Sequence, residues 1–471
     1  MASPFQIPNV RLFIWFRVLF GARFYYPIFT ILFLDLGISL DQFALLNVAW
    51  AASIILLEVP SGALADIVGR RNLVVAAAGL MIFEMVVLIL APVGSSPLLF
   101  SLLLINRIAS GAAEAAASGA DEALAYDSLA EGGDVTDWPR VLERQMHATS
   151  IAFVVSSTVG ATVYDPVLMN RVFHMLGGTA ELSQALTLRF PIVLCLLAAI
   201  GAFCVALRMR DVRSPGAQGF RICREDISCA LRNATRMTLR TGLWIFQTPA
   251  ALVIILTGVT FDSMIRLFLT MSSQYYRVIQ LPEASFGIIG SALSLLGLII
   301  PGWAKRLTQT RSPRFNVLLM ASLSWLGIWG LTFGTPYLGL LPVIPIFAAF
   351  FLLMFFMSHY LNSITDASRR ATVLSFRGLV FNLGYAGIGI LYSLLVALRR
   401  PEVRAENPDA EISVIEDLVF VDAMQYWPGY FLATLLLTAA FAAWKLRGLK
   451  HRGTPPATPG GAKGEEEKIT E

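Results

Sequence analysis

The chain has 471 residues, of which 56% are hydrophobic and only 14% are charged, and its mean hydropathy is +0.67. Soluble globular proteins carry roughly a quarter charged residues, so this composition excludes that class and indicates a protein that crosses a membrane many times. The formal net charge of +4 gives no indication of nucleic-acid binding, because the basic residues follow membrane topology instead.

The chain contains twelve long apolar runs. A helix needs about 20 mostly apolar residues to cross the bilayer core, and only helices or closed barrels satisfy their backbone hydrogen bonds in lipid. The runs are too long for the short alternating strands of a barrel. We therefore expect an all-α membrane protein with twelve transmembrane helices, at Leu12–Leu34, Phe43–Leu64, Leu73–Val93, Leu98–Ala125, Ala148–Val167, Phe190–Leu207, Ala250–Met271, Phe286–Trp303, Phe315–Phe333, Leu338–Leu361, Ala371–Leu398 and Trp427–Leu446.

The basic residues predict the orientation of these spans. Cytoplasmic loops retain lysine and arginine, and most of the 36 such residues fall in cytoplasmic segments if the N-terminus is inside. The outer segments would hold only Arg171, Arg189, Arg277, Arg399, Arg400 and Arg404. We therefore expect a protein of the cytoplasmic (inner) membrane with both termini in the cytoplasm.

A short segment between the second and third spans places a carboxylate, a turn glycine and two arginines between apolar runs. It matches the pattern Gly-x-x-x-Asp-(Arg/Lys)-x-Gly-Arg-(Arg/Lys), and the chain in this respect resembles transporters of the Major Facilitator Superfamily. Ile67 departs from the pattern, since the family usually has a base there. The matching residues are Gly62, Asp66, Gly69, Arg70 and Arg71.

The resemblance implies two pseudo-symmetric six-helix bundles that rock around a binding site at the membrane midplane. We divide the chain accordingly into a first bundle (1–207), a cytoplasmic linker (208–248), a second bundle (249–446) and a disordered cytoplasmic tail (447–471). Pro60–Gly62 near the end of the second span is echoed by Pro301–Gly302 near the end of the eighth, which is consistent with duplicated halves.

The resemblance also implies a gating latch, in which the aspartate and arginine of the motif contact an acidic residue at the inner end of the fourth span. Here that residue is Asp127. An exposed ion pair contributes only about 0–1 kcal/mol, so such a latch would bias a conformational equilibrium without locking it. The residues assigned to the latch are Gly62, Asp66, Gly69, Arg70, Arg71 and Asp127.

The fourth predicted span contains several ionisable side chains at regular spacing. Arg107, Glu114 and Asp121 are spaced seven apart, which places them on one stripe of a continuous helix, and Arg107 with Gly111 resembles the fourth-helix motif that the family uses in proton coupling. Ionisable residues at membrane depth usually face a cavity or a partner. Two interpretations remain open, a role of Glu114 or Asp121 in transport and a buried ion pair that holds helices together.

Other charges at membrane depth complete a candidate substrate and proton cavity. Arg23 lies in the first span, and Asp262 and Arg266 lie four apart in the seventh, where they can pair on one helix face. That pair is either part of the cavity or a structural bridge, and Glu84 is expected to support the cavity from outside. The candidate cavity residues are Arg23, Arg107, Glu114, Asp121, Asp262 and Arg266.

Two segments outside the spans show helical spacing. In the linker, Phe220, Cys223, Ile227, Leu231 and Ala234 form an apolar face opposite a basic one, which is typical either of a helix on the inner membrane surface that contacts anionic lipid or of a solvated connector. The outer loop 399–426 either caps the outer face with a short amphipathic helix or is an uninvolved excursion.

Several sites are not predicted. The sequence has no phosphate-binding Gly-x-x-x-x-Gly-Lys-(Ser/Thr) loop, and its cysteines and histidines are scattered, so we expect no ATP-driven pump, no disulfide scaffold, no metal site and no enzyme. These residues are Cys195, Cys204, Cys223, Cys229, His147, His174, His359 and His451. No cofactor is expected, and the hypothesised driving force is a proton gradient.

These observations predict a secondary active transporter that moves a small solute by alternating access. Import, export and the charge of the substrate stay open. We expect a monomer that contacts a small-molecule substrate and membrane lipid and no nucleic acid. The competing interpretations are a non-transporting receptor or scaffold with the same fold and a membrane-embedded enzyme.

Overall fold

The computed structural model describes residues 3–211, 242–365 and 370–450, together with 232, 235, 236, 239 and 240. Of residues 63, 66, 67, 370–372 and 447–450 it describes the backbone only. Every regular element in this part of the chain is a helix, and 12 helical segments are long and apolar enough to cross a membrane. The prediction of an all-α protein with twelve spans is confirmed.

The N-terminal half of the molecule comprises the helices up to residue 208. Its elements are η1 (Pro4–Gln6), α1 (Pro8–Gly21), η2 (Tyr26–Ile28), α2 (Phe29–Leu36), α3 (Leu40–Val68), α4 (Arg70–Leu90), α5 (Pro97–Ala117), α6 (Ala120–Gly132), η3 (Val135–Asp137), α7 (Trp138–Tyr164), α8 (Pro166–Met175), α9 (Gln184–Thr187) and α10 (Phe190–Arg208).

The C-terminal half follows from residue 249. Its elements are α12 (Pro249–Val278), η4 (Glu283–Ser285), α13 (Phe286–Ser294), α14 (Leu296–Thr310), α15 (Pro313–Leu331), η5 (Leu338–Leu340), α16 (Val343–Ser363), α17 (Arg370–Glu406), α18 (Ile412–Met424) and α19 (Trp427–Lys450). The expected linker helix at Phe220, Cys223, Ile227, Leu231 and Ala234 falls outside the described residues, as does the tail after 450.

Several helices begin with a capping side chain followed by proline. The side chains of Ser96, Asp165 and Ser312 accept hydrogen bonds from backbone N–H groups of α5, α8 and α15, and a proline occupies the first helical position in each case. A side-chain acceptor satisfies a free N–H of the first turn, and proline has no N–H that needs a partner there. These pairs fix where the apolar runs become helical.

Three expected spans are interrupted, which the apolar runs did not indicate. The first breaks at residues 22–28, where Pro27 cannot donate a backbone hydrogen bond. The fourth breaks between α5 and α6, where Gly119 has a φ of +76°. The eighth divides into α13 and α14 at Leu295. The break in the fourth span interrupts the continuous helix on which the predicted stripe of Arg107, Glu114 and Asp121 depended.

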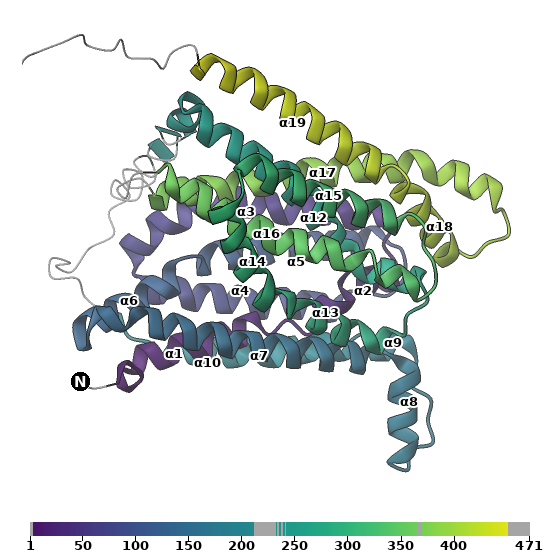
Figure 1. Cartoon of the computed structure of the whole chain (residues 1–471). Coiled ribbons are helices and arrows are strands. Elements are labelled where there is room, and N and C mark those ends of the chain that lie inside the picture. The colour runs from purple at the N-terminus through teal and green to yellow at the C-terminus, as the bar shows by residue number, and fades with distance from the viewer. Residues whose placement is uncertain are drawn as a thin grey trace, which may run out of the picture.

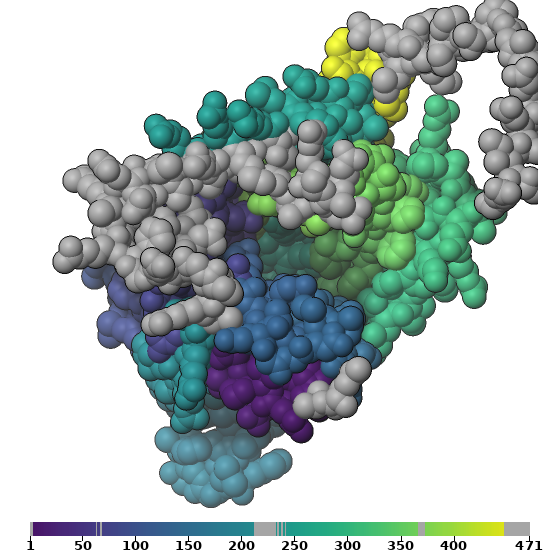
Figure 2. All heavy atoms as spheres, turned by 90° about the vertical axis from the view of Figure 1, so that its left-hand side faces the viewer, coloured from purple at the N-terminus to yellow at the C-terminus, as the bar shows by residue number. Residues whose placement is uncertain are grey.

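The two ends of the bundle differ. The start of α1, the turn at Gly69 and α6 lie at the end on the left of Figure 1, while the end of α2 and α18 lie on the right. The halves pack against each other through α3 with α17, α7 with α13, and α2 with α12. Seen from the left-hand end, the surface is hollowed between the blue α6 region and the green C-terminal half (Figure 2). We call this the open end, and the opposite one the sealed end.

The loop at 399–426 is largely helical. α17 extends to Glu406, beyond the expected end of the eleventh span, and α18 packs on the sealed end through Ile415, Val419, Phe420, Ala423 and Met424, which are all buried. Of the two interpretations of this loop, the structure favours a helix that covers this end of the bundle.

Candidate functional site

The motif residues at the open end make contacts within one half of the molecule. Arg70 at the start of α4 forms an ion pair with Asp127 on α6, and both side chains are about one third exposed. The predicted contact between these two residues is confirmed. Because α4 and α6 both belong to the N-terminal half, the pair does not hold the two halves together in this conformation. The side chain of Asp66 is outside the described part of the structure.

Arg71 and Gly69 anchor the end of α10. The backbone N–H of Arg71 donates to Asp211 Oδ1 at 2.9 Å, and its guanidinium donates to the carbonyl oxygens of Met209 and Leu207 at 2.7 and 2.9 Å. Gly69 has a φ of +99°, and a Cβ there would lie 2.8 Å from Asp211 Oδ2. Asp211 was not predicted, since it is 140 residues from Arg71.

Gly62 lies inside α3, where it is exposed, and a Cβ at this position would meet no atom within 4 Å. Of the motif's two glycines, only Gly69 is therefore required by local geometry in this conformation.

The break in the first span carries a buried ion pair. Arg23 is 2% exposed and contacts Glu84 on α4, which is 0% exposed. A second carboxylate oxygen, Glu114 Oε1 on α5, lies 3.8 Å from Arg23 Nη2. Glu84 was expected only to support the cavity, and it is instead the closest anionic partner of a predicted cavity residue.

Glu114 and Asp121 differ in their surroundings. The Glu114 side chain on α5 is 38% exposed. Asp121 is buried on α6, and its Oδ2 lies 2.6 Å from Arg17 Nε on α1. The helix break at Gly119 thus gives the two carboxylates different partners.

Arg107 is a buried cation held mainly by aromatic rings. It is 5% exposed, and its guanidinium lies 5.1 Å from the ring centroid of Phe29 and 5.5 Å from that of Trp50. Its Nη2 donates to Asn47 Oδ1 at 3.3 Å. No carboxylate of the described residues lies within ion-pair distance of it. Gly111, four residues along α5, allows this close packing, because a Cβ there would lie 2.6 Å from the carbonyl oxygen of Trp50.

The C-terminal half contributes a second cationic centre. Arg266 Nη2 lies 2.7 Å from Asp262 Oδ2, which confirms the predicted pairing four residues apart on α12. Arg266 Nη1 also donates to Asn382 Oδ1 at 2.8 Å, and its guanidinium lies 5.4 Å from the ring of Tyr385. Asp262 and Arg266 are thus paired with each other and held against α17.

Two aromatic rings connect these centres across the halves. Trp50 of α3 and Tyr385 of α17 meet edge to face with centroids 6.4 Å apart, and the hydroxyl groups of Tyr385 and Thr270 are hydrogen-bonded at 2.9 Å. Arg107 packs on Trp50 and Arg266 on Tyr385. The predicted cavity residues Arg107 and Arg266 are therefore linked through two aromatic rings at the contact between α3 and α17.

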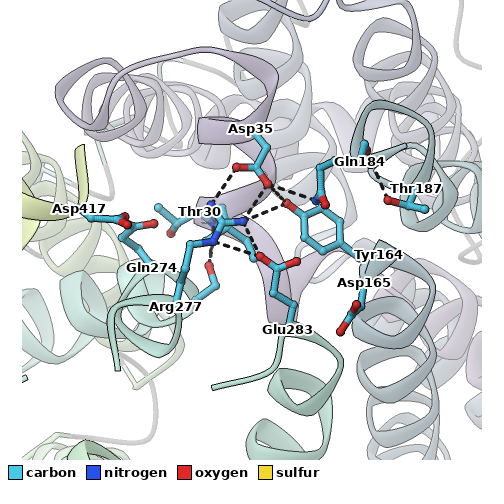
Figure 3. Close-up of polar contacts among 12 residues, drawn as sticks. Thr30, Asp35, Tyr164, Asp165, Gln184, Thr187, Gln274, Arg277, Glu283 and Asp417 are labelled. Carbon is cyan, nitrogen blue, oxygen red and sulfur yellow. Dashed lines mark hydrogen bonds and ion pairs between the residues drawn. The ribbon is translucent and has the colours of Figure 1, made fainter. Parts of the chain in front are cut away.

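The sealed end contains a network that the sequence did not predict (Figure 3). Arg277, at the end of α12, donates from Nη1 and Nη2 to the two carboxylate oxygens of Asp35, each at 2.8 Å. Tyr164 of α7 donates its hydroxyl to Asp35, and Arg277 Nη2 also donates to Glu283 Oε1 at 2.7 Å. Asp35 and Tyr164 belong to the N-terminal half, and Arg277 and Glu283 belong to the C-terminal half.

A second network joins the halves beside it. Arg400 of α17 lies 2.5 Å from Asp41 of α3 and 2.9 Å from Glu416 of α18. Glu416 Oε2 also accepts a hydrogen bond from the backbone N–H of Leu40 at 2.9 Å. The only sequence signal for either network was a set of charges at span ends, and the sequence does not say which of them pair.

Among the described residues, no three histidine, cysteine, aspartate or glutamate side chains come together as metal ligands would. The charged clusters are instead ion pairs between carboxylates and arginines. Such pairs can bind and release charged groups. They can also break and form again when the two halves move against each other.

Comparison with known proteins identifies relatives of the fold. The family model of the Major Facilitator Superfamily matches residues 12–389. No curated protein sequence gives a significant match. A solved bacterial homologue of the human lysosomal transporter Spinster, in an inward-facing and unoccupied conformation, has 13% identity and a TM-score of 0.68 over 97% of this chain and 100% of its own.

Two other solved structures are similar over most of their length. The nucleoside transporter NupG has 14% identity and a TM-score of 0.61, over 95% of this chain and 100% of its own. A D-xylose–proton symporter has 13% identity and a TM-score of 0.61, over 89% of this chain and 96% of its own. At these identities the similarity concerns the fold.

Proposed function

The chain belongs to the Major Facilitator Superfamily, and from this multi-pass membrane transporter fold we propose that it moves a small solute across the cytoplasmic membrane by alternating access. The observation that carries the proposal is the asymmetry of contacts between the halves. The two ion pairs that join the halves among the described residues, Asp35–Arg277 and Asp41–Arg400, both lie at the sealed end. The opposite end is hollowed (Figure 2).

We assign the open end to the cytoplasm. The arginine-rich motif and both described chain ends lie there, and cytoplasmic segments retain positive charge. The conformation would then be inward-facing, as in the Spinster homologue. Opening of the sealed end in the other half of the cycle requires that Asp35–Arg277 and Asp41–Arg400 separate.

The proposed substrate site is the aromatic and cationic centre between the halves. Arg107, Trp50, Tyr385 and Arg266 form a continuous series of contacts from α5 to α12. A solute bound there contacts both halves, so its affinity depends on their relative position. Alternating access requires this dependence. Arg107 supplies a buried positive charge with no carboxylate of the described residues within ion-pair distance.

Proton coupling is proposed to act through Glu114. A proton carrier must be reachable by water and must sit beside a group that responds to its charge. The Glu114 side chain is 38% exposed and its Oε1 lies 3.8 Å from Arg23 Nη2, whereas Asp121 and Asp262 are buried in closer pairs. Protonation of Glu114 would leave Arg23 to Glu84 alone and alter the charge beside the substrate site.

The test begins with a thermal-shift screen of purified protein against drugs, sugars, amino acids, organic anions and lysolipids. A stabilising ligand is then supplied to proteoliposomes that contain a pH-sensitive dye. We expect substrate-dependent uptake that moves protons. A ligand that binds without any uptake would contradict transport, and uptake that ignores the proton gradient would contradict coupling.

Glu114→Gln separates these two claims. The variant is expected to lose accumulation driven by a pH gradient while it keeps exchange of labelled for unlabelled substrate, because a neutral amide cannot release a proton. Glu122→Gln, which changes an exposed carboxylate on α6, is the matched control and should behave as wild type. Gradient-driven accumulation that persists in Glu114→Gln would exclude this residue as the carrier.

A further inference from the structure

A groove lies between α1 and α7 at the open end, outside the proposed substrate site. Its volume is about 700 Å³, and its walls include Arg11, Trp15 and Val18 of α1 and Arg140 and Arg144 of α7. This volume is in the usual range for small-molecule sites, about 300–1,000 Å³. No part of the transport cycle described above uses it.

Helical spacing places these side chains on the facing sides of two neighbouring helices. Arg11, Trp15 and Val18 are four and three residues apart, and Arg140 and Arg144 are four apart, so each set lies on one face. α1 and α7 pack together, and both begin at the open end. The three arginines therefore lie at the mouth of the groove, at the level of the helix starts.

The mouth carries excess positive charge. In the part of the chain that the structure describes, Glu143 is the single carboxylate that lines the groove. None of Arg11, Arg140 and Arg144 forms an ion pair with a described residue, although Arg140 lies 5.6 Å from the ring of Phe5. An anion entering the groove would meet three arginines, and Glu143 is the one carboxylate among the described lining residues that would oppose it.

Beyond the arginines the wall becomes apolar. Trp15, in the wall, is 59% exposed, and Ile151 and Val155, which lie farther along α7 beyond the residues that line the groove, are 66% and 53% exposed. In a membrane protein, such side chains on a spanning helix face lipid tails, and tryptophan is enriched at the level of the headgroups. The groove thus offers a charged mouth at headgroup depth and an apolar path along the span.

We propose that this groove binds one anionic phospholipid. Arg11, Arg140 and Arg144 hold the phosphate, for which the planar guanidinium group is well suited, and an acyl chain follows Trp15, Val18 and Ile151. Basic pockets between transmembrane helices on the cytoplasmic side favour anionic headgroups in general. A free phosphate ion would use only the mouth and leave the apolar wall without a ligand.

Native mass spectrometry of the detergent-solubilised full chain tests the proposal. The probes are phosphatidylglycerol, phosphatidylcholine with the same acyl chains, and inorganic phosphate. Wild type is expected to bind one phosphatidylglycerol in preference to the other two. Equal binding of phosphatidylcholine would overturn the role of charge, and equal binding of inorganic phosphate would overturn the role of the acyl chain.

Substitutions locate the site. Each arginine near a membrane surface changes anionic-lipid affinity about fivefold, so Arg11→Gln, Arg140→Gln and Arg144→Gln together should weaken phosphatidylglycerol binding by about a hundredfold. The matched control is Arg306→Gln, Arg311→Gln and Arg314→Gln, which removes three exposed arginines from α14–α15. Equal loss in both triple variants would mean general surface attraction and would overturn the site.

The Glu143→Gln variant distinguishes loss of the lipid site from loss of binding through misfolding. It removes the only carboxylate among the described residues that line the groove, and it should tighten phosphatidylglycerol binding about fivefold. A damaged protein cannot produce such a gain. Unchanged or weaker binding in this variant would overturn the proposal.

Discussion

At the scale of single residues, the ion pairs are of two kinds, pairs within one helix and pairs between segments that are far apart in the chain. Asp262 and Arg266 are four apart on one helix, so helical geometry alone predicted their contact. Asp35 and Arg277 are 242 residues apart, and each could have paired with any opposite charge at the same end. The family resemblance supplied Asp127 as the partner of Arg70, and it gave no indication of Asp211.

The buried pair of Arg23 and Glu84 predicts a large effect on stability. Glu84→Gln leaves the Arg23 charge without its closest carboxylate, and removal of one partner of a buried pair typically costs about 3–5 kcal/mol. We expect a marked fall in the melting temperature of the purified protein. Glu114→Gln, on the more exposed and more distant partner of Arg23, should lower it much less. Similar melting temperatures for both variants would contradict the assignment of Glu84 as the main partner.

Alanine substitutions at the two motif glycines are predicted to have different effects on stability. Gly69→Ala forces a Cβ into a backbone conformation that only glycine readily adopts, close to the Asp211 carboxylate, at a cost of about 1–3 kcal/mol. Gly62→Ala fills open space inside a helix and should be neutral or stabilise by up to about 1 kcal/mol. Thermal denaturation of the two variants side by side measures this. A larger loss in Gly62→Ala than in Gly69→Ala would refute the geometric account.

At the scale of helices, the apolar runs predicted the number and places of the spans and missed their internal breaks. Hydropathy is insensitive to a break that keeps apolar residues on both sides, as at Leu295 between α13 and α14. Pro27 was a visible signal for the break at 22–28, because proline lacks the N–H that a helix interior needs. Gly119 was hidden among small residues that equally suit close helix packing.

α18 is an element whose role can be tested through Glu416. Glu416→Gln weakens its bonds to Arg400 and to the Leu40 N–H, and loss of about 1.4 kcal/mol from such a charge-assisted bond corresponds to a factor of ten. We expect the population of molecules in which the sealed end is open to rise roughly tenfold. The readout is alkylation of a cysteine introduced by Ser273→Cys, a position that is 1% exposed between the halves.

The control for this experiment is Glu402→Gln. Glu402 is an exposed residue of α17 that contacts Arg399, and its loss leaves the contacts between the halves intact. Faster alkylation in Glu416→Gln alone supports a closing role for α18. Equal rates in the two variants would show that α18 covers this end without stabilising its closure.

At the scale of the whole molecule, the family resemblance predicted two halves and a central site, and the conformation could not be read from the sequence. The motif residues predicted a latch at the inner end of the fourth span, within the first bundle. They gave no indication of the ion pairs between the halves, which lie at the sealed end. Which end is closed depends on small differences among many contacts, and a single sequence encodes both states.

The central claim is that the halves rock, so that the two ends open in alternation. Double electron–electron resonance measures it directly in protein whose native cysteines are replaced. One pair of spin labels spans the sealed end at Ser95 and Thr335, and another spans the open end at Glu131 and Gln309, all exposed positions. Asp35→Asn should shift the population about tenfold toward the outward-open state.

We predict that Asp35→Asn lengthens the Ser95–Thr335 distance and shortens the Glu131–Gln309 distance in the same fraction of molecules. Both distances lengthening together, or the sealed end opening while the other end stays unchanged, would contradict alternating access.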